Sequence, residues 1–270
     1  MYGDYGGLKK QLNKMDTLPI NLIVFATTMG HQGDHGNPAG DTYQTVISNL
    51  FSQVDPSIFQ NKVMHLKVRS EEEDKAREIK NFCTSEDIRV IESHEDIVHH
   101  FEDNVSHAAG YFKDIYKTYS DTEIRKTKYS LWLEDDWLLR LNKIKLEDTL
   151  AESINFLDNN PDQLCVKYNL PDDSVWDFRK AKGNHFAERG NIFTQAKDYT
   201  EYGPAFHFQP NINRTSEIFL AWKTLQQHLH RLGSYHCELM ATHLLREGFS
   251  NSETPFSFFD PEKIYSQHIG

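Results

Sequence analysis

The stretch Leu131-Trp-Leu-Glu-Asp-Asp-Trp-Leu-Leu139 places three consecutive acids, Glu134, Asp135 and Asp136, inside an apolar run. Apolar residues on both sides are typical of a buried strand in a sheet that is covered on both faces. Buried carboxylates are costly, so three adjacent ones need a cation, hydrogen-bond donors or water. A divalent metal that carries a polyphosphate would meet this need, and in an open α/β sheet such ligands bind at the carboxyl ends of strands. The stretch therefore predicts a metal and phosphate site at a strand end.

Composition limits the function classes that remain open. The chain has 270 residues and a formal net charge of −11, which argues against wrapping nucleic acid through a basic surface. No apolar run approaches the roughly 18 residues that span a bilayer, and the polar start lacks the apolar core of a signal peptide. The three cysteines, Cys83, Cys165 and Cys237, are widely spaced and form no CxxC pair. We therefore expect a cytoplasmic protein with no transmembrane segment and no nucleic-acid partner.

Strand and helix patterns alternate in the first half of the chain, which predicts an α/β fold built on a parallel sheet. Buried strands are expected where β-branched and apolar residues form short runs, and helices where apolar residues recur every three or four positions. The expected strands cover residues 20–27, 62–68, 88–92, 164–168 and the run that enters the acidic triplet. The expected helices cover residues 41–53, 71–83, 105–119 and 146–158.

The second half is less regular. Residues 171–203 are polar and show no clear period, and a strand is possible over 203–209. Helices are expected from Thr215 or Ser216 onward and over 235–247, and the aromatic tail from residue 255 to 270 should pack on the domain. The predicted organisation is a flexible arm over 1–17 and one domain over 18–270. Its first half covers residues 18–140 and its second half, with the tail, covers 141–270; the resemblance described next implies that these are a donor-binding and an acceptor-side half.

The order of these parts resembles the nucleotide-sugar-dependent glycosyltransferases of the GT-A fold. The first strand ends in Ala26-Thr-Thr28, and the helix that follows contains Thr45-Val-Ile-Ser-Asn-Leu-Phe-Ser-Gln53. Glu134-Asp-Asp136 stands where the family has its DxD motif. Glu238 stands where the family carries a late acidic element, and His268 is similar to its C-terminal metal-binding histidine. The resemblance implies a mostly parallel nucleotide-binding sheet with flanking helices and a less regular acceptor-side half.

The resemblance also implies an activity and a set of residues. The activity is transfer of a sugar from a UDP- or GDP-type donor to a hydroxyl of a glycan or other acceptor, with inversion and with Mn²⁺ or Mg²⁺. Asp136 and His268 would bind the metal, and Glu238 would be the general base. The donor would contact Thr27, Thr28, Glu92, Asn104, His107, Glu134 and Asp135, and Glu92 would read the uracil or guanine edge of its base. The acceptor would contact Trp176, His207 and Arg214.

The sequence departs from the family pattern at two points. The DxD motif begins with Glu134, and the late motif reads His236-Cys-Glu-Leu239, so His236 is an alternative base. Two other functions stay open. A sugar-nucleotide nucleotidyltransferase usually has a basic, Gly-rich loop after the first strand, whereas residues 29–40 contain no Lys or Arg. A non-catalytic sugar-binding protein on the same fold is the third reading.

Overall fold

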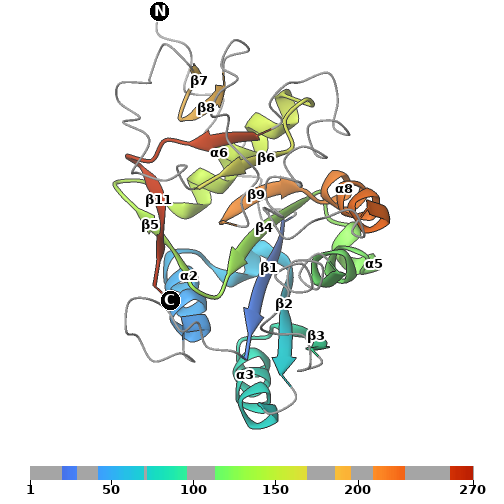
Figure 1. Ribbon diagram of the computed structural model, residues 1–270. Coiled ribbons are helices and arrows are strands. Elements are labelled where there is room, and N and C mark those ends of the chain that lie inside the picture. The colour runs from blue at the N-terminus through green and yellow to red at the C-terminus, as the bar shows by residue number, and fades with distance from the viewer. Residues whose placement is uncertain are drawn as a thin grey trace, which may run out of the picture.

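The computed structural model describes residues 20–28, 42–69, 72–95, 113–168, 186–195, 209–228 and 256–269. Within these ranges the chain forms one nine-stranded sheet and a separate two-stranded sheet, with helices packed against the large one (Figure 1). The strand order of the large sheet is β3-β2-β1-β4-β9-β6-β10-β8-β7.

The first half of the sheet is entirely parallel. Its strands are β1 (Ile20–Thr27), β2 (Phe59–Arg69), β3 (Arg89–Glu95) and β4 (Tyr129–Glu134). The helices between them are α2 (Thr42–Gln53), η1 (Pro56–Ile58), α3 (Glu73–Ser85), the helical residues 113–119 and α5 (Thr122–Arg125). The chain moves outward from β1 to β3 and then returns to the other side of β1 as β4, pairing in parallel with it. This reversal of direction is a topological switch point between β1 and β4.

The second half of the sheet is mixed. Its elements are α6 (Leu146–Asn159), β6 (Cys165–Lys167), β7 (Phe186–Arg189), β8 (Ile192–Gln195), β9 (Asn211–Arg214), α8 (Thr215–His228) and β10 (Phe256–Phe259). β9 runs antiparallel to both of its neighbours, and β8 does the same. All the other strands of the large sheet point in one direction. The predicted fold class, a mostly parallel α/β sheet with flanking helices and a less regular second half, is confirmed.

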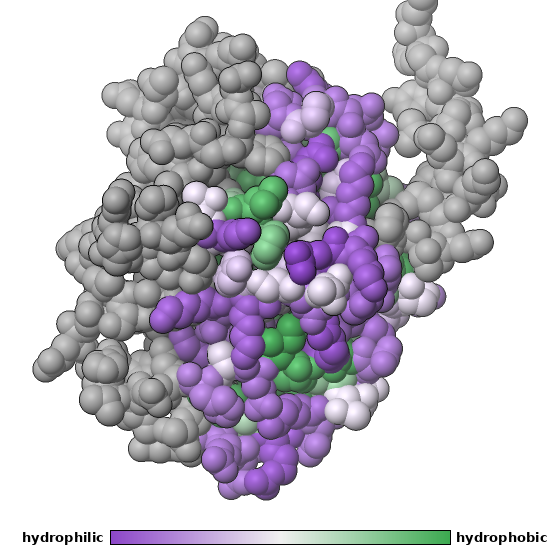
Figure 2. Space-filling model, turned by 90° about the vertical axis from the view of Figure 1, so that its right-hand side faces the viewer, coloured by the Kyte–Doolittle hydropathy of each residue, from purple (hydrophilic) through white to green (hydrophobic). Residues whose placement is uncertain are grey.

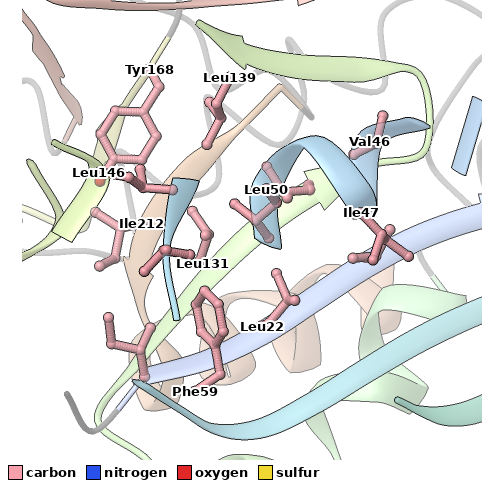
Figure 3. Close-up of a cluster of buried hydrophobic side chains, with 14 of the residues drawn as sticks. Leu22, Val46, Ile47, Leu50, Phe59, Leu131, Leu139, Leu146, Tyr168 and Ile212 are labelled. Atoms are coloured by element: carbon pink, nitrogen blue, oxygen red, sulfur yellow. The ribbon is translucent and has the colours of Figure 1, made fainter. Parts of the chain in front are cut away.

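Two apolar cores cover the two faces of the large sheet. On one face, α2 buries Val46, Ile47 and Leu50 against Leu22 of β1 and Leu131 of β4 (Figure 3). These α2 residues recur at helical spacing, which explains why this segment is a helix that packs on a sheet. The other face carries an aromatic core that includes the residues Phe25, Tyr119, Trp132 and Trp222. Burial of both faces accounts for the unbroken apolar sequence of β1 and β4.

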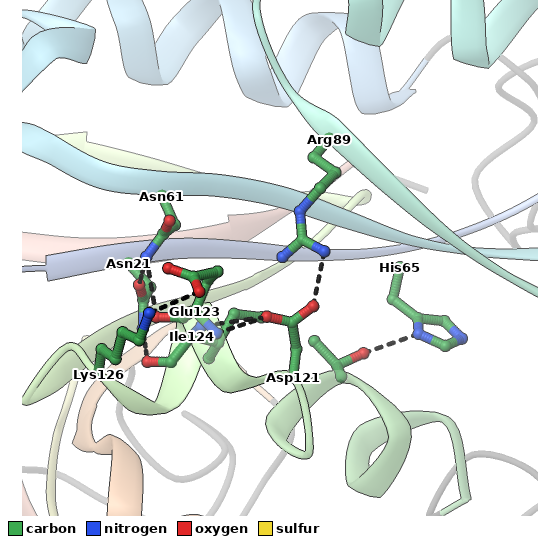
Figure 4. A network of polar contacts seen from close by, with 9 residues as sticks. Asn21, Asn61, His65, Arg89, Asp121, Glu123, Ile124 and Lys126 are labelled. Carbon is green, nitrogen blue, oxygen red and sulfur yellow. Dashed lines mark hydrogen bonds and ion pairs between the residues drawn. The ribbon is translucent and has the colours of Figure 1, made fainter.

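A buried polar network holds the amino ends of the parallel strands. The Nδ2 group of Asn21 donates to the carbonyl of Ile124 at 2.9 Å and to Oγ of Ser130 at 3.1 Å. Nδ2 of Asn61 donates to Oδ1 of Asn21 at 2.7 Å, so β1, β2 and α5 are tied together (Figure 4). Structural hydrogen bonds fill this edge of the sheet, whereas Thr27, Thr28 and the acidic triplet lie at the opposite, carboxyl edge.

The two-stranded sheet lies beside the large one. β5 (Trp137–Leu141) leaves the main sheet after the acidic turn and pairs antiparallel with β11 (Ile264–His268), as Figure 1 shows. The tail packs on the domain as predicted, because Phe256, Phe258 and Phe259 are all buried. Among the described residues the large apolar side chains exposed to solvent are Leu220 and Tyr265. Hydrophilic side chains cover most of the described part of the face in Figure 2.

The structure refines several predicted boundaries. β2 begins three residues before the expected strand, and β3 continues to Glu95 instead of ending at Glu92. β5 and β9 were not predicted. The expected arm over 1–17 and the expected helix over 235–247 lie outside the described residues. In the part of the chain that is described, no helix is long and apolar enough to cross a membrane.

Candidate functional site

The acidic triplet lies at the carboxyl end of β4, where the chain turns. β4 ends at Glu134, and Asp135 and Asp136 form the turn that leads into β5. The three acids therefore do not continue the strand. Asp135 is 5% exposed and Asp136 is 4% exposed, whereas Glu134 is half-buried. Buried carboxylates at a strand end require polar or cationic partners, and the structure provides them from β1 and from β11.

Asp135 is held against the end of β1. Its backbone N–H donates to the carbonyl of Phe25 at 3.0 Å, and its Oδ2 accepts from the N–H of Thr27 at 3.4 Å. The N–H of Thr28, whose side chain is buried, donates to the carbonyl of Lys67 on β2 at 3.0 Å. The structure thus brings Thr27, Thr28 and Asp135 together, and their contact with a donor stays a prediction. They lie at the switch point between β1 and β4, where open α/β sheets bind their ligands.

Asp136 contacts the C-terminal strand. Its Oδ2 lies 3.0 Å from Nε2 of His268, and its carbonyl accepts from the N–H of Ile269 at 2.8 Å. His268 pairs with Trp137 across the two-stranded sheet, and the two rings are 5.1 Å apart. The imidazole is 40% exposed and the carboxylate 6% exposed. Two residues that are 132 positions apart in the sequence, both predicted as metal ligands, are therefore neighbours.

The donor set of this pair fits a hard divalent cation. Carboxylate oxygens suit Mg²⁺ and Mn²⁺, and an imidazole favours Mn²⁺. Two ligands bound at about 2.1 Å in adjacent octahedral positions lie about 3 Å from each other. The 3.0 Å between Asp136 and His268 therefore suits a shared ion as well as a direct hydrogen bond. In the described ranges no group of three or more His, Cys, Asp or Glu side chains is arranged to hold a metal.

Glu92 does not join this group. Glu92 was expected where the third strand ends, but β3 continues past it to Glu95. Its carboxylate pairs with Nζ of Lys80 on α3, at 3.0 and 3.2 Å, and its carbonyl accepts from Nζ of Lys117 at 2.5 Å. The carboxylate is thus directed to the face of the sheet that α3 covers. This placement does not favour the predicted contact with the base.

Arg214 lies at the opposite edge of the sheet from the acidic turn. It pairs in register with Tyr129, the first residue of β4. Its guanidinium donates to the carbonyls of Gln163 at 2.9 Å, Asn160 at 3.3 Å and Leu157, where α6 ends. A cation that satisfies the last carbonyls of a helix has a structural role. The predicted acceptor contact is therefore corrected to a helix-capping contact.

Five predicted site residues and the alternative base His236 lie outside the described residues. The five are Asn104, His107, Trp176, His207 and Glu238. Their roles stay predictions.

Two lysines that are largely shielded from solvent at the carboxyl edge were not predicted. Lys67 is opposite Thr27 in the β1–β2 register, and its side chain is 11% exposed. Lys167 ends β6 and is 1% exposed. Both lie on the face that carries Trp132. Lys167 and Trp132 are each opposite Asn211 of β9. Lys67 is four residues after Val63 on β2, and Val63 and Trp132 are each opposite Ile23 of β1. The available signal was a lysine inside a short apolar run, since charged residues are rarely buried without a partner.

Comparison with known proteins gives structural similarity only. No protein-family model matches the sequence, and none of the curated proteins compared with it gives a match. A putative glucose-1-phosphate thymidylyltransferase from Bacillus anthracis has a TM-score of 0.48 and 6% identity, over 92% of this chain and 89% of that one. The 4-diphosphocytidyl-2C-methyl-D-erythritol synthase of Anaerococcus prevotii has a TM-score of 0.43 and 12% identity, over 92% and 90%. Core-mannan synthase A of Aspergillus fumigatus, in its Mn/GDP form, has a TM-score of 0.40 and 12% identity, over 92% and 74%. At these values the similarity assigns no activity to this chain.

Proposed function

We propose that this protein is a metal-dependent glycosyltransferase. It would transfer a sugar from a nucleoside diphosphate to a hydroxyl group of a glycan or other acceptor. The observation that carries the proposal is the contact between Asp136 and His268 at the carboxyl end of β4. A buried carboxylate and an imidazole from distant parts of the chain meet beside the switch point, where the fold favours nucleotide binding.

Each residue of the site would have a distinct task. Asp136 and His268 would hold Mn²⁺ or Mg²⁺. The ion would neutralise the diphosphate and stabilise the departing nucleoside diphosphate as a Lewis acid. Asp135, fixed by the N–H of Thr27, keeps the acidic turn against β1. Thr27 and Thr28 would line the nucleoside part of the site. The predicted base Glu238 would take the proton of the acceptor hydroxyl, whose oxygen would attack the anomeric carbon in line, break its bond to the diphosphate and so invert it.

The first test is metal-dependent nucleotide binding. Titration calorimetry with UDP, GDP, CDP, dTDP and ADP, with and without Mn²⁺, should give binding of at least one nucleotide that requires the metal. Asp136→Asn and His268→Gln should each weaken this binding at least tenfold, because each removes a ligand of the ion. Release of the nucleoside diphosphate from the matching nucleotide sugar, with incorporation of the sugar into an acceptor, would then establish transfer.

A matched control separates loss of the site from loss of a histidine in general. His94 is an exposed histidine on β3, so His94→Gln should leave nucleotide binding unchanged. Metal-dependent binding that survives Asp136→Asn would contradict the proposal. Binding without any sugar transfer would point instead to a sugar-nucleotide-binding protein.

One observation favours nucleotidyl transfer as a second candidate. Joining a nucleoside triphosphate to a sugar phosphate brings two phosphate groups together, and cations near both would reduce their repulsion. Lys167 is a buried cation at the carboxyl end of β6, two strand positions from β4. Pyrophosphate released from a nucleoside triphosphate and a sugar 1-phosphate, and lost in Lys167→Met, would support this activity over sugar transfer.

A further inference from the structure

The carboxyl edge next to the proposed site contains a lysine that a buried polar network holds in place. Lys67 lies on β2, directly opposite Thr27, and its carbonyl accepts the N–H of Thr28. Its Nζ is 3.7 Å from Oδ2 of Asp114, which lies on the helical residues 113–119. The side chains of both residues are about nine-tenths buried. The ion pair therefore joins the sheet to this helix at the edge where the donor would bind.

His65 fixes the carboxylate of this pair. Its ring is 1% exposed, stacks on Phe25 and reaches from β2 toward the helix (Figure 4). Nδ1 of His65 lies 2.7 Å from Oγ1 of Thr118, and Nε2 lies 3.0 Å from Oγ of Ser93 and 3.4 Å from Oδ1 of Asp114. The imidazole thus contacts β3 and the helix at once, which leaves little freedom for Asp114.

Asp114 is ionised at neutral pH. Its burial alone would raise the pKa of the carboxyl group. The hydrogen bond and the charge of His65, the charge of Lys67 and the hydrogen bond from Ser93 outweigh burial and hold the pKa below its usual value. The negative charge of Asp114 attracts the ammonium of Lys67, whose Nζ lies 3.7 Å from the carboxylate. A hydrogen bond from an ammonium in such a dry place is stronger than one in water.

The position of Lys67 along the edge indicates which part of a nucleotide it would meet. The strand order places β1 between β4 and β2, so the acidic turn and Lys67 are two strand spacings, about 10 Å, apart. A diphosphate over Asp136 and a ribose beside Thr27 would leave the base near β2. An ammonium has three N–H donors and no acceptor, so it distinguishes bases by their exocyclic groups, because it binds a carbonyl oxygen but not an amino group.

We propose that Lys67, positioned by Asp114, is a specificity residue of the donor site whose ammonium donates a hydrogen bond to a carbonyl oxygen of the base. Uracil and guanine present such an oxygen. Adenine presents an amino donor at the corresponding place, which an ammonium cannot bind. This inference rests on the proposed nucleotide site, and it transfers to Lys67 the base-reading role that the sequence had suggested for Glu92.

The test compares nucleotide preference in Lys67→Met with that of the wild type. Binding of UDP, GDP and ADP is measured by calorimetry with Mn²⁺. The wild type should bind UDP or GDP at least tenfold more tightly than ADP. Lys67→Met should lose at least tenfold on the preferred nucleotide and little on ADP, so the preference should largely disappear. The double variant Lys67→Met/Asp114→Asn avoids an uncompensated buried carboxylate and should behave in the same way if the single variant folds poorly.

Lys62→Met is the matched control. Lys62 lies on the same strand and pairs with Asp87 at 3.0 Å, but it lies near the amino end of β2. Its removal should not change nucleotide preference. An equal loss for all three nucleotides in Lys67→Met, or no loss at all, would overturn the inference, and so would a wild type that prefers ADP. A wild type that binds CDP or dTDP but none of these three would overturn the inference alone, and one that binds none of the five nucleotides would refute the proposed function as well.

Discussion

The corrected role of Arg214 leads to a quantitative prediction about stability. Arg214 is 7% exposed and donates to three carbonyls near the end of α6, one of them at the long distance of 3.3 Å. Hydrogen bonds from a charged donor contribute about 1.5–3 kcal/mol each, and an unsatisfied buried carbonyl is costly. Water entering the space left by the guanidinium would recover part of this. We therefore expect Arg214→Met to lower the free energy of unfolding by about 3 kcal/mol.

The assay is thermal unfolding, followed by circular dichroism. For a chain of this size each kcal/mol lowers the melting temperature by about 2–4 °C, so Arg214→Met should melt roughly 6–12 °C lower than the wild type. Methionine keeps most of the apolar stem, so the change reports the lost hydrogen bonds more than lost packing. At a temperature where the variant is folded, nucleotide binding should equal that of the wild type.

Arg89 supplies the comparison for this prediction. Its guanidinium pairs with Asp121 at 2.6 Å, but it is 47% exposed. An exposed ion pair contributes about 0–1 kcal/mol, so Arg89→Met should change the melting temperature by a few degrees at most. The reasoning would be refuted if Arg214→Met melted like the wild type. A raised Michaelis constant for the acceptor together with unchanged stability would restore the role expected from the sequence.

Three further predictions concern side chains that are shielded from solvent. Burial raises the pKa of the Cys83 and Cys165 thiols to about 12, so both should resist alkylation at pH 8 until the protein unfolds, as peptide mapping by mass spectrometry would detect. The folded-state pKa of Asp114 is lowered, so the stability that its ionised carboxylate contributes is complete above the unfolded pKa of about 3.9 and is lost as pH falls through the folded value. When melting temperatures are measured from pH 2.5 to 7, those of Asp114→Asn should therefore fall less steeply on the acid side than those of the wild type. Leu50→Ala, at a site that is 1% exposed, should cost about 2–5 kcal/mol in urea unfolding, whereas Leu220→Ala, at a site that is 58% exposed, should cost little.

The sequence predicted the elements whose burial pattern is strong. β1 is apolar along its whole length because both faces of the sheet are covered, and its predicted bounds, residues 20 and 27, are those of the structure. α2 and α6 were found from apolar residues at helical spacing. The acidic triplet was found because charged residues next to a buried strand require an explanation, whereas Thr27 and Thr28 were named from the resemblance alone.

Long-range pairing could not be predicted from these patterns. β5 and β9 are short, and their positions depend on partners far along the chain, β11 for the first and both β4 and β6 for the second. Glu92 pairs with Lys80, and Arg214 donates to carbonyls near the end of α6. These partners lie elsewhere in the sequence, so neither contact could be predicted from the residues around Glu92 or Arg214. A side chain acquires its function from its three-dimensional neighbours, and sequence periodicity specifies few of them.

The strand that carries His268 has a practical consequence for handling this protein. Its imidazole contacts Asp136, and so does the backbone N–H of the next residue, Ile269. A polyhistidine tag fused shortly after Ile269 would therefore bring many more imidazoles near the acidic turn, where they would compete for the proposed Mn²⁺. Metal titrations of such a fusion would report the tag along with the protein. Attaching the tag before Met1, or cleaving it before measurement, avoids this false signal.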